Sequence, residues 1–484
     1  MAMADRNRSD WLWLAAILAL ALVLRIPGLN GPLWYDEILT VDTHLRLPWG
    51  EMMRAYSMNH HYLHDVFAKA AILAFGEQSW SIRLPALVFG IAGIAAMWWL
   101  ARDIAGRGAA LATALLMALS FHHIWFSQNA RGYTGIAFFS TVGLILFLRG
   151  IDRPRAATWI AFGVALAAAV FTHLTAIFFF AALAILWLWT LVARRGRPEW
   201  RRLALMPLLG AAVGAGLTLL AYLPILPGIL EAARTVSDTS AVDVMQEYQN
   251  PLWTVAEALR TAIGSAGPRV LAVGLVVLAL VLAGAVRLAG RAPLFAPAVG
   301  LHILLTIGVL LAIGGRIWPR FFFADIGFLL LLIVAGVEAV TAFVARILGR
   351  PGIRPALLGL AVALMALVSL MLAVRNYAAP KQDLAGAYAL AEAARRPGER
   401  IYALGPAAAV FRNHFHADWG AIEDEAAYRA AMQAAGPITL VVAFPGRVLR
   451  QIPALASDRQ AGLTLLRDFP GTLGDGEVLV LRRD

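Results

Sequence analysis

The sequence of 484 residues contains no cysteine, which excludes disulfide bonds, thiolate metal sites and a cysteine nucleophile. Lysine is scarce as well, since every basic residue except Lys69 and Lys381 is arginine. Charged residues make up only 15% of the chain and hydrophobic residues 60%. This balance excludes an ordinary soluble multidomain protein, and we predict a polytopic α-helical membrane protein.

The formal net charge of +11 would also suit a nucleic-acid-binding protein, so the position of the charge decides its meaning. Most arginines stand in short loops between apolar runs. There they orient membrane spans, because loops on the cytoplasmic side carry an excess of basic residues. We therefore expect no nucleic-acid partner.

Apolar runs recur from residue 11 to about 374 and, at about 20 residues per crossing, predict about eleven spans. The first is expected to stay uncleaved, because it lacks a small-x-small cleavage site. The expected spans are 11–27, 84–101, 109–126, 133–149, 157–172, 174–193, 203–223, 268–286, 294–314, 321–343 and 355–374.

Alternate loops hold short clusters of arginine, which predicts a multi-pass membrane protein with a cytoplasmic N-terminus. We expect residues 1–375 to form the transmembrane module, with outward loops at 28–83 and 224–267. The remainder, 376–484, is mixed in polarity, with a helical pattern in "KQDLAGAYALAEAARR" and strand-like runs in "ERIYAL", "ITLVVAF" and "EVLVLRRD". It predicts a small extracytoplasmic α/β domain.

Polar side chains gather at the mouths of the outward loops. The stretch "GPLWYDEILTV" places two carboxylates just beyond the first span, and residues 62–75 have the apolar spacing of an amphipathic helix at the membrane surface. Ionised groups in lipid need partners or a wet cavity. The candidate residues are Tyr35, Asp36, Glu37, His60, His61, His64, Asp65, Lys69, Gln128, Arg131, Tyr133, His173, Arg316 and Arg320.

These residue types suit group transfer from a lipid-borne substrate. A carboxylate such as Asp36 accepts the proton of an attacking hydroxyl. Arginines such as Arg131, Arg316 and Arg320 hold a phosphate leaving group through paired hydrogen bonds.

Five ordered motifs resemble the bacterial GT-C membrane glycosyltransferases, especially family 39 protein mannosyltransferases and the aminoarabinose transferases that modify lipid A. They are "LWYDEILT", "GEQSWSIRLPALVFG", "SQNARGYTGIAFFSTVGLILFLR", "THLTAIFFF" and "PRFFFADIGFLLLL", and the resemblance covers about residues 11–343. It implies a polyprenyl-phosphate sugar donor, inversion at the sugar carbon and a catalytic aspartate in the first outward loop.

The resemblance matches that aspartate to Asp36, with Glu37 as its companion, and matches Arg131 and Arg320 to arginines of the family. We assign donor-phosphate binding to Arg131, Arg316, Arg320 and Lys69. We assign substrate binding to Tyr35, His60, His61, Asp65, Gln128, Tyr133 and His173. Where family members read "HPPLYY" this chain reads "HHYLHD", so the acceptor side is specialised.

Each assignment has a structural alternative. Asp36 and Glu37 also suit the first turn of a surface helix. The arginines also suit snorkelling at span ends, and His173 suits an interhelical hydrogen bond. Glu37, His60 and His61 are candidate ligands of a divalent metal ion. Alternatively, the histidines face lipid headgroups and Glu37 pairs with an arginine. No other cofactor is expected.

We therefore predict an inverting glycosyltransferase that moves a sugar from a polyprenyl-phosphate donor to a hydroxyl of a protein, lipid A or another glycan. The alternatives are a transporter or flippase of a polyprenyl-linked glycan and a non-catalytic envelope assembly protein. A transporter would place charged or broken segments at mid-membrane, whereas an assembly protein would depend on the tail.

Overall fold

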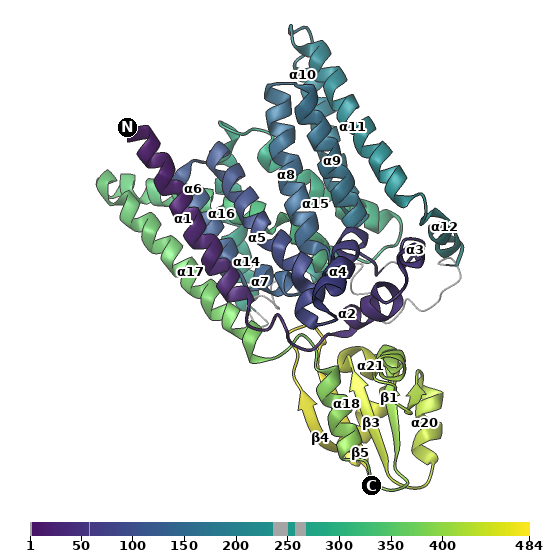
Figure 1. The fold of residues 1–484 in the computed structure, drawn as a ribbon. Coiled ribbons are helices and arrows are strands. Elements are labelled where there is room, and N and C mark those ends of the chain that lie inside the picture. The colour runs from purple at the N-terminus through teal and green to yellow at the C-terminus, as the bar shows by residue number, and fades with distance from the viewer. Residues whose placement is uncertain (1, 58, 236–249, 257–267) are drawn as a thin grey trace.

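The computed structural model describes residues 2–57, 59–235, 250–256 and 268–484. Much of the predicted outward loop at 224–267 therefore lies outside the described residues. The chain forms a helical bundle followed by a small α/β unit at one end of it (Figure 1).

The long helices of the bundle correspond to all eleven predicted spans. They are α1 (Ala2–Arg25), α5 (Ser79–Ile104), α6 (Arg107–Leu119), α7 (Phe121–Ser127), α8 (Tyr133–Asp152), α9 (Ala156–Thr172), α10 (Ala176–Ala193), α11 (Trp200–Tyr222), α14 (Pro268–Ala289), α15 (Phe295–Ala312), α16 (Ile326–Ile347) and α17 (Arg354–Ala378).

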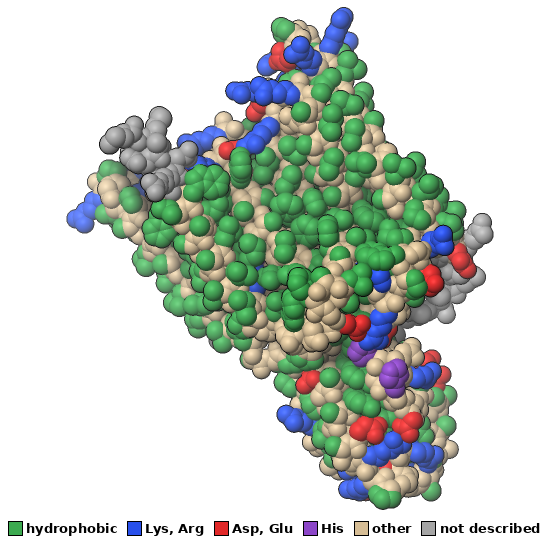
Figure 2. Space-filling model, viewed as in Figure 1, with side chains coloured by type: hydrophobic (Ala, Val, Ile, Leu, Met, Phe, Trp, Pro, Cys, Tyr) green, Lys and Arg blue, Asp and Glu red, His purple; other side chains and the backbone are tan. Residues whose placement is uncertain are grey.

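Eight helices in the described part of the chain are long and apolar enough to cross a membrane, and the bent pair α6–α7 makes nine. The helix α9 is apolar but shorter, and α1 covers the first predicted span. Hydrophobic side chains cover the bundle and charged ones gather towards its ends (Figure 2). The chain is a multi-pass membrane protein.

Shorter elements lie beside the bundle. They are α2 (Tyr35–Thr40), the π-helical η1 (Val41–Leu45), α3 (Trp49–Met52), α4 (Tyr62–Phe75), α12 (Leu226–Thr235), the 3-10 helix η4 (Pro319–Asp325) and η5 (Pro351–Ile353).

The amphipathic helix predicted at 62–75 is α4, but its polar side turns inward. His64, Asp65 and Lys69 are buried, while Phe67, on the opposite side, and Leu73, near the end of the helix, are exposed. An apolar face turned outward suits a helix at a lipid interface. The polar residues of α4 consequently contact protein rather than headgroups.

The α/β unit is built on a five-stranded sheet of order β2-β1-β3-β5-β4, in which β2, β1 and β3 are parallel and β5 and β4 are antiparallel. Its elements are α18 (Leu384–Ala393), β1 (Arg400–Leu404), η6 (Gly405–Ala407), α19 (Ala408–Asn413), β2 (Gly420–Ile422), α20 (Glu425–Gln433), β3 (Ile438–Ala443), α21 (Pro445–Gln451), α22 (Pro453–Ala461), β4 (Thr464–Phe469) and β5 (Val478–Arg483).

The carboxyl end of β3 faces the loop that follows the first span. Phe444, which follows β3, packs its ring edge against Tyr35 with centroids 5.4 Å apart. Ile38 belongs to the apolar core on one face of the sheet. The α/β unit therefore touches the short helix that bears Asp36.

Candidate active site

Asp36 and Glu37 stand in the first turn of α2, as the structural alternative for this stretch expected. Their side chains point to different surroundings. Asp36 is 14% exposed, and one of its carboxylate oxygens accepts a hydrogen bond of 3.3 Å from Arg320. A carboxylate that keeps access to solvent beside a cation is able to take up a proton from a substrate hydroxyl.

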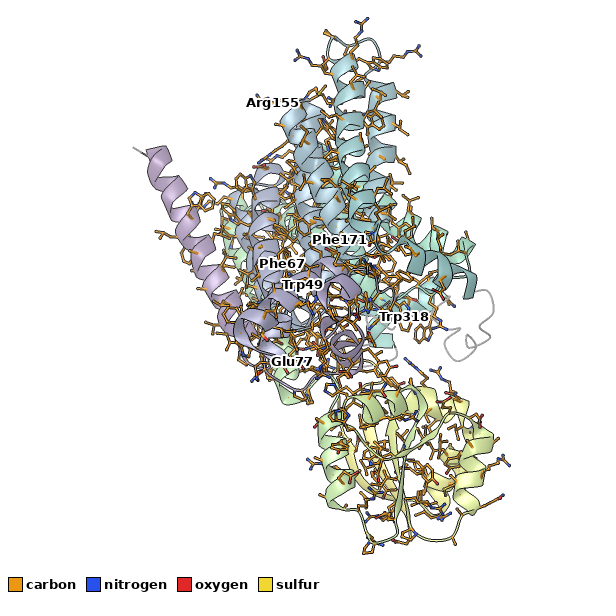
Figure 3. All side chains as sticks on the ribbon, turned by 45° about the vertical axis from the view of Figure 1, so that its right-hand side comes forward. Trp49, Phe67, Glu77, Arg155, Phe171 and Trp318 are labelled. Carbon is orange, nitrogen blue, oxygen red and sulfur yellow. The ribbon has the colours of Figure 1, made fainter. Side chains whose placement is uncertain are left out.

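Arg320 reaches Asp36 from η4, which lies 284 positions further along the chain. Its guanidinium also lies over the Trp318 ring at 4.7 Å, and Figure 3 shows Trp318 at the end of the bundle that faces the α/β unit. Asp325, the last residue of η4, accepts a buried hydrogen bond of 2.9 Å from His302. Sequence reasoning missed this pair, which positions the turn that carries Arg320.

Arg131 contacts α2 one helical turn after Asp36. It is only 2% exposed and donates to the Thr40 hydroxyl at 3.1 Å, and Thr40 in turn donates to the backbone oxygen of Asp36 at 2.9 Å. Within the described part of the chain, Nε of Arg131 has no hydrogen-bond partner. A buried cation with unused donors is costly to leave unpaired, which suits an anionic ligand.

His61 and His173 lie next to this arginine. Their rings are 4.7 Å apart, and His61 also packs against Tyr133 at 4.8 Å. Both ring nitrogens of His61 lack hydrogen-bond partners among the described residues. Burial, and after it the charge of Arg131, lowers the pKa of His61 well below its usual value and that of His173 to about 3. Both imidazoles are therefore neutral near pH 7.

These buried imidazoles predict a loss of stability in acid. Burial also lowers the pKa of His60 to about 4. Below pH ~6.5 the unfolded chain binds protons on these histidines while the folded chain does not, so stability present above that pH falls as the pH drops. We expect the midpoint of thermal unfolding in detergent to decrease between pH 7 and pH 5.

The His173→Asn variant should show a smaller decrease than the native protein. His416 is exposed, so His416→Asn serves as the matched control and should keep the native pH dependence. An identical pH dependence in the His173 variant would contradict the neutral, buried state of this imidazole.

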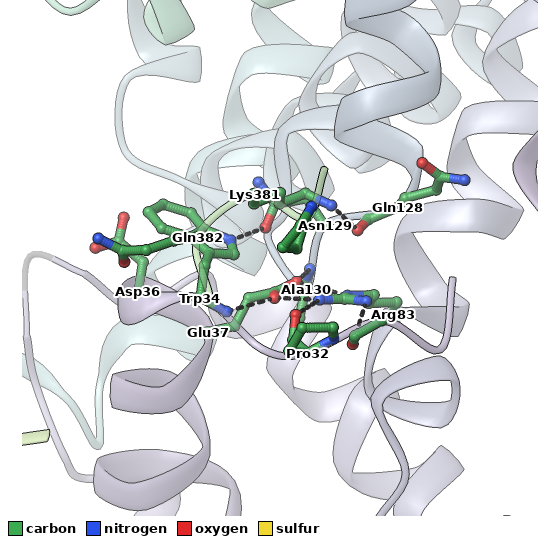
Figure 4. Close-up of polar contacts among 12 residues, drawn as sticks. Pro32, Trp34, Asp36, Glu37, Arg83, Gln128, Asn129, Ala130, Lys381 and Gln382 are labelled. Carbon is green, nitrogen blue, oxygen red and sulfur yellow. Dashed lines mark hydrogen bonds and ion pairs between the residues drawn. The ribbon is translucent and has the colours of Figure 1, made fainter. Parts of the chain in front are cut away.

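Glu37 has a different environment from that of Asp36. It is fully buried and accepts four hydrogen bonds, from Nε and NH2 of Arg83 at 2.8 and 2.5 Å, from the Trp34 amide at 3.2 Å and from the Ala130 amide at 2.7 Å (Figure 4). Burial raises the pKa of this carboxyl, but the charge and hydrogen bonds of Arg83 outweigh burial and leave the pKa lowered.

These four hydrogen bonds occupy the roughly four accepting positions of the Glu37 carboxylate. The contacts tie α2, α5 and the loop that precedes Arg131 together. Glu37, which we expected to be catalytic with Asp36, thus has the surroundings of a residue that positions Asp36 and Arg131.

Several other predicted ligands also contact the protein itself. Lys69 donates to the backbone oxygens of Leu45, at 2.8 Å, and Leu47. Gln128 donates to the backbone oxygen of Arg25 at 2.9 Å. These contacts hold the backbone on either side of the site in place, and both side chains bond to the protein itself.

Asp65 forms hydrogen bonds with histidines around it. Its carboxylate accepts from Nδ1 of His44 at 2.8 Å and from Nδ1 of His64 at 3.2 Å, and His60 stacks on His44. Burial raises the pKa of Asp65, but the hydrogen bonds from the two histidines outweigh burial and leave the pKa lowered. In the described part of the chain no three His, Asp or Glu side chains converge as metal ligands would. Glu37, His60 and His61 are not brought together.

Two residues of the linker to the α/β unit enter the site unpredicted. Lys381 donates to the backbone oxygen of Gln128 at 2.6 Å, and the Tyr35 amide donates to Gln382 at 3.3 Å (Figure 4). Burial and the Arg83 charge lower the pKa of Lys381 to about 7 against the opposing effect of Glu37. The scarcity of lysine in this chain was the one feature of the sequence that could have singled out Lys381.

The structure thus brings together Asp36, Arg131 and Arg320, with His61, Tyr133 and His173 beside them. Tyr35 lies at the contact with the α/β unit, where burial and Asp36 raise the pKa of its hydroxyl. Arg316 stands in the segment just before η4.

The chain is similar to known glycosyltransferases in sequence and in structure. Residues 59–223 match the family model described as dolichyl-phosphate-mannose-protein mannosyltransferase. No curated protein matches the sequence. The solved apo structure of ArnT from Cupriavidus metallidurans is similar at 16% identity and a TM-score of 0.54, covering 99% of this chain and 98% of that one.

Two structures from Archaeoglobus fulgidus are similar as well. The oligosaccharyltransferase in complex with Zn and sulfate has 14% identity and a TM-score of 0.55, with 90% of this chain and 68% of that chain covered. The oligosaccharyltransferase AglB in complex with an inhibitory peptide and a dolichol-phosphate has 13% identity and a TM-score of 0.50, with 94% and 73% covered. The chain therefore shares the fold of the GT-C glycosyltransferases, which confirms the resemblance seen in the sequence.

Proposed function

We propose that the chain is an inverting glycosyltransferase that takes a sugar from a polyprenyl-phosphate donor at the outer face of the bacterial inner membrane. The observation that carries the proposal is the pairing of Asp36 with Arg320 beside the buried Arg131, in a GT-C fold. The dolichol-phosphate in the similar AglB structure supports a lipid phosphate as part of the donor.

In the proposed reaction Asp36 takes the proton of the acceptor hydroxyl. The hydroxyl oxygen then attacks the anomeric carbon from the face opposite the leaving group, and the bond from that carbon to the phosphate oxygen breaks. The electron pair leaves with polyprenyl phosphate, whose charge Arg131 and Arg320 stabilise. Neutral His61 and His173 add polar contacts without adding charge.

The contact between Arg320 and Asp36 is compatible with this reaction. The ion pair holds both side chains at the rim. An arriving phosphate competes for the guanidinium, which frees Asp36 to receive the acceptor proton. The pair is part-exposed, so exchanging one partner for another costs little.

The arrangement of the chain in the membrane follows as part of the proposal. Residues 1–375 form the catalytic module and 376–484 the extracytoplasmic unit, with the N-terminus in the cytoplasm. The Asp36 site then lies at the outer face, and the arginine clusters that the sequence places in alternate loops lie opposite. The acceptor is a lipid, a glycan or a protein that presents a hydroxyl.

Arg131 and Arg320 should set the affinity for the donor. We expect Arg131→Ala and Arg320→Ala to raise the KM for a synthetic polyprenyl-phosphate sugar by roughly 10- to 100-fold, since a hydrogen bond to a charged group contributes about 1.5–3 kcal/mol. Native mass spectrometry of each variant, released from mild detergent, should show loss of the lipid-phosphate adduct.

Arg155→Ala is the matched control, because Arg155 is exposed at the end of the bundle away from the α/β unit (Figure 3). It should bind and turn over the donor as the native protein does. Binding without any release of sugar to an acceptor would favour a flippase over a transferase. Donor binding unchanged in both site variants would contradict the assigned phosphate contacts.

A further inference from the structure

Two adjoining hollows open between α14 and α16, far from Asp36. One holds about 100 Å³ and the other about 390 Å³, and Arg287 lines both. The helix α16 starts next to η4, which carries Arg320, and Arg346 lies in its last turn. At 1.5 Å per residue the hollows therefore lie up to about 30 Å from the Asp36–Arg320 pair, towards the other face of the membrane.

The hollows carry excess positive charge. Arg287 donates to Glu338 at 2.8 and 3.0 Å, so these two charges offset each other. Arg291 lines the smaller hollow and Arg346 the larger one, and both are exposed. Glu338 is the one acid among the described lining residues, which leaves two positive charges for an anion.

The walls beside these arginines are apolar and open to the side. Val286 and Phe343 line the larger hollow, with 78% and 60% of their surfaces exposed, and Ala283, Ala339 and Ala342 complete that wall. A small inorganic anion gains nothing from such a wall. A phospholipid fits both parts, because its phosphate contacts arginine while its acyl chains cover Val286 and Phe343.

The scaffold around the hollows is held rigidly. A Cβ built on Gly284 would lie 1.9 Å from the Leu332 backbone oxygen, and one on Gly336 would lie 2.0 Å from that of Leu280. The two helices thus pack with their backbones in contact, as small residues allow in membranes. The ion pair between Arg287 and Glu338 joins them again beside the hollows.

We propose that these hollows bind the headgroup of an anionic phospholipid of the phosphatidylglycerol type, with its phosphodiester between Arg291 and Arg346. A volume of about 390 Å³ lies in the range of small-molecule sites. Basic pockets between membrane helices are suited to such headgroups. This site is independent of the proposed sugar transfer.

The test is native mass spectrometry of the full chain in mild detergent, titrated with dioleoylphosphatidylglycerol and, separately, with dioleoylphosphatidylcholine. The native protein should prefer the anionic lipid. The R291A/R346A variant should bind it roughly thirtyfold more weakly, the factor for two arginines that contribute about 1 kcal/mol each. This variant keeps the Arg287–Glu338 pair, so no buried charge is left without its partner.

The control is R201A/R202A, which removes two exposed arginines from the start of α11 and should retain native binding. A second variant, R291K/R346K, keeps the charge and should bind the anionic lipid well even if the alanine variant folds poorly. Equal losses in the test and control variants, or equal binding of both lipids, would overturn the proposal. Displacement of the lipid by millimolar inorganic phosphate would replace it with a site for a free anion.

Discussion

Replacement of Asp36 by Asn is expected to abolish sugar transfer and to leave the fold intact. Asn has nearly the same shape but cannot take up the acceptor proton, and a positioned general base contributes about 10²- to 10⁴-fold to the rate. The lost contact is one part-exposed ion pair of 3.3 Å with Arg320, which contributes at most about 1 kcal/mol to stability. Turnover with a polyprenyl-phosphate sugar and the thermal unfolding midpoint measure the two effects.

Asp42 offers a matched control six residues further along the same loop. Its carboxylate is bound by Arg46 at 2.6 Å and by His414 at 3.0 Å, and the proposed reaction gives it no role. Asp42→Asn should keep at least half of the native kcat, whereas Asp36→Asn should keep a per cent or less. Retained turnover in the Asp36 variant would remove Asp36 from the mechanism, while donor binding could still be intact.

The helical architecture was predictable because lipid imposes it. A span needs about 20 apolar residues, and every backbone group in it must be hydrogen-bonded internally. Runs of apolar residues therefore locate each span. The strands β1, β3 and β5 were predicted because each contains several apolar residues, most of them buried. The strands β2 and β4 were missed because β2 has three residues and β4 is an edge strand with mostly exposed side chains.

The site was predictable in part, for a different reason. Asp36, Arg131 and Arg320 stand out in the sequence because charges near lipid are rare, and the structure brings them together. The same rarity singled out Glu37 and Lys69, whose partners are an arginine 46 residues away and two backbone oxygens. Partners of this kind depend on tertiary packing, so the sequence cannot separate a catalytic charge from a positioning one.

Replacement of Glu37 by Gln is expected to lower the stability of the protein, unlike replacement of Asp36 by Asn. Glu37→Gln replaces one accepting oxygen by an NH2 group, which would face donors of Arg83 or the Ala130 amide and leave the buried guanidinium without its counter-charge. Removal of one partner of a buried ion pair costs about 3–5 kcal/mol. We expect a large drop in the unfolding midpoint and a reduced yield of folded protein, measured in detergent.

Glu51→Gln is the control for this prediction, because Glu51 lies exposed in α3 and should change stability by no more than about 0.5 kcal/mol. A double-mutant cycle with Arg83→Met should give a coupling free energy above 1 kcal/mol, as expected for residues that share hydrogen bonds. Native stability combined with lost turnover in Glu37→Gln would instead make Glu37 catalytic. Lost stability, with turnover of the folded fraction less affected than in Asp36→Asn, would establish that Glu37 acts by holding Asp36 and Arg131 in place.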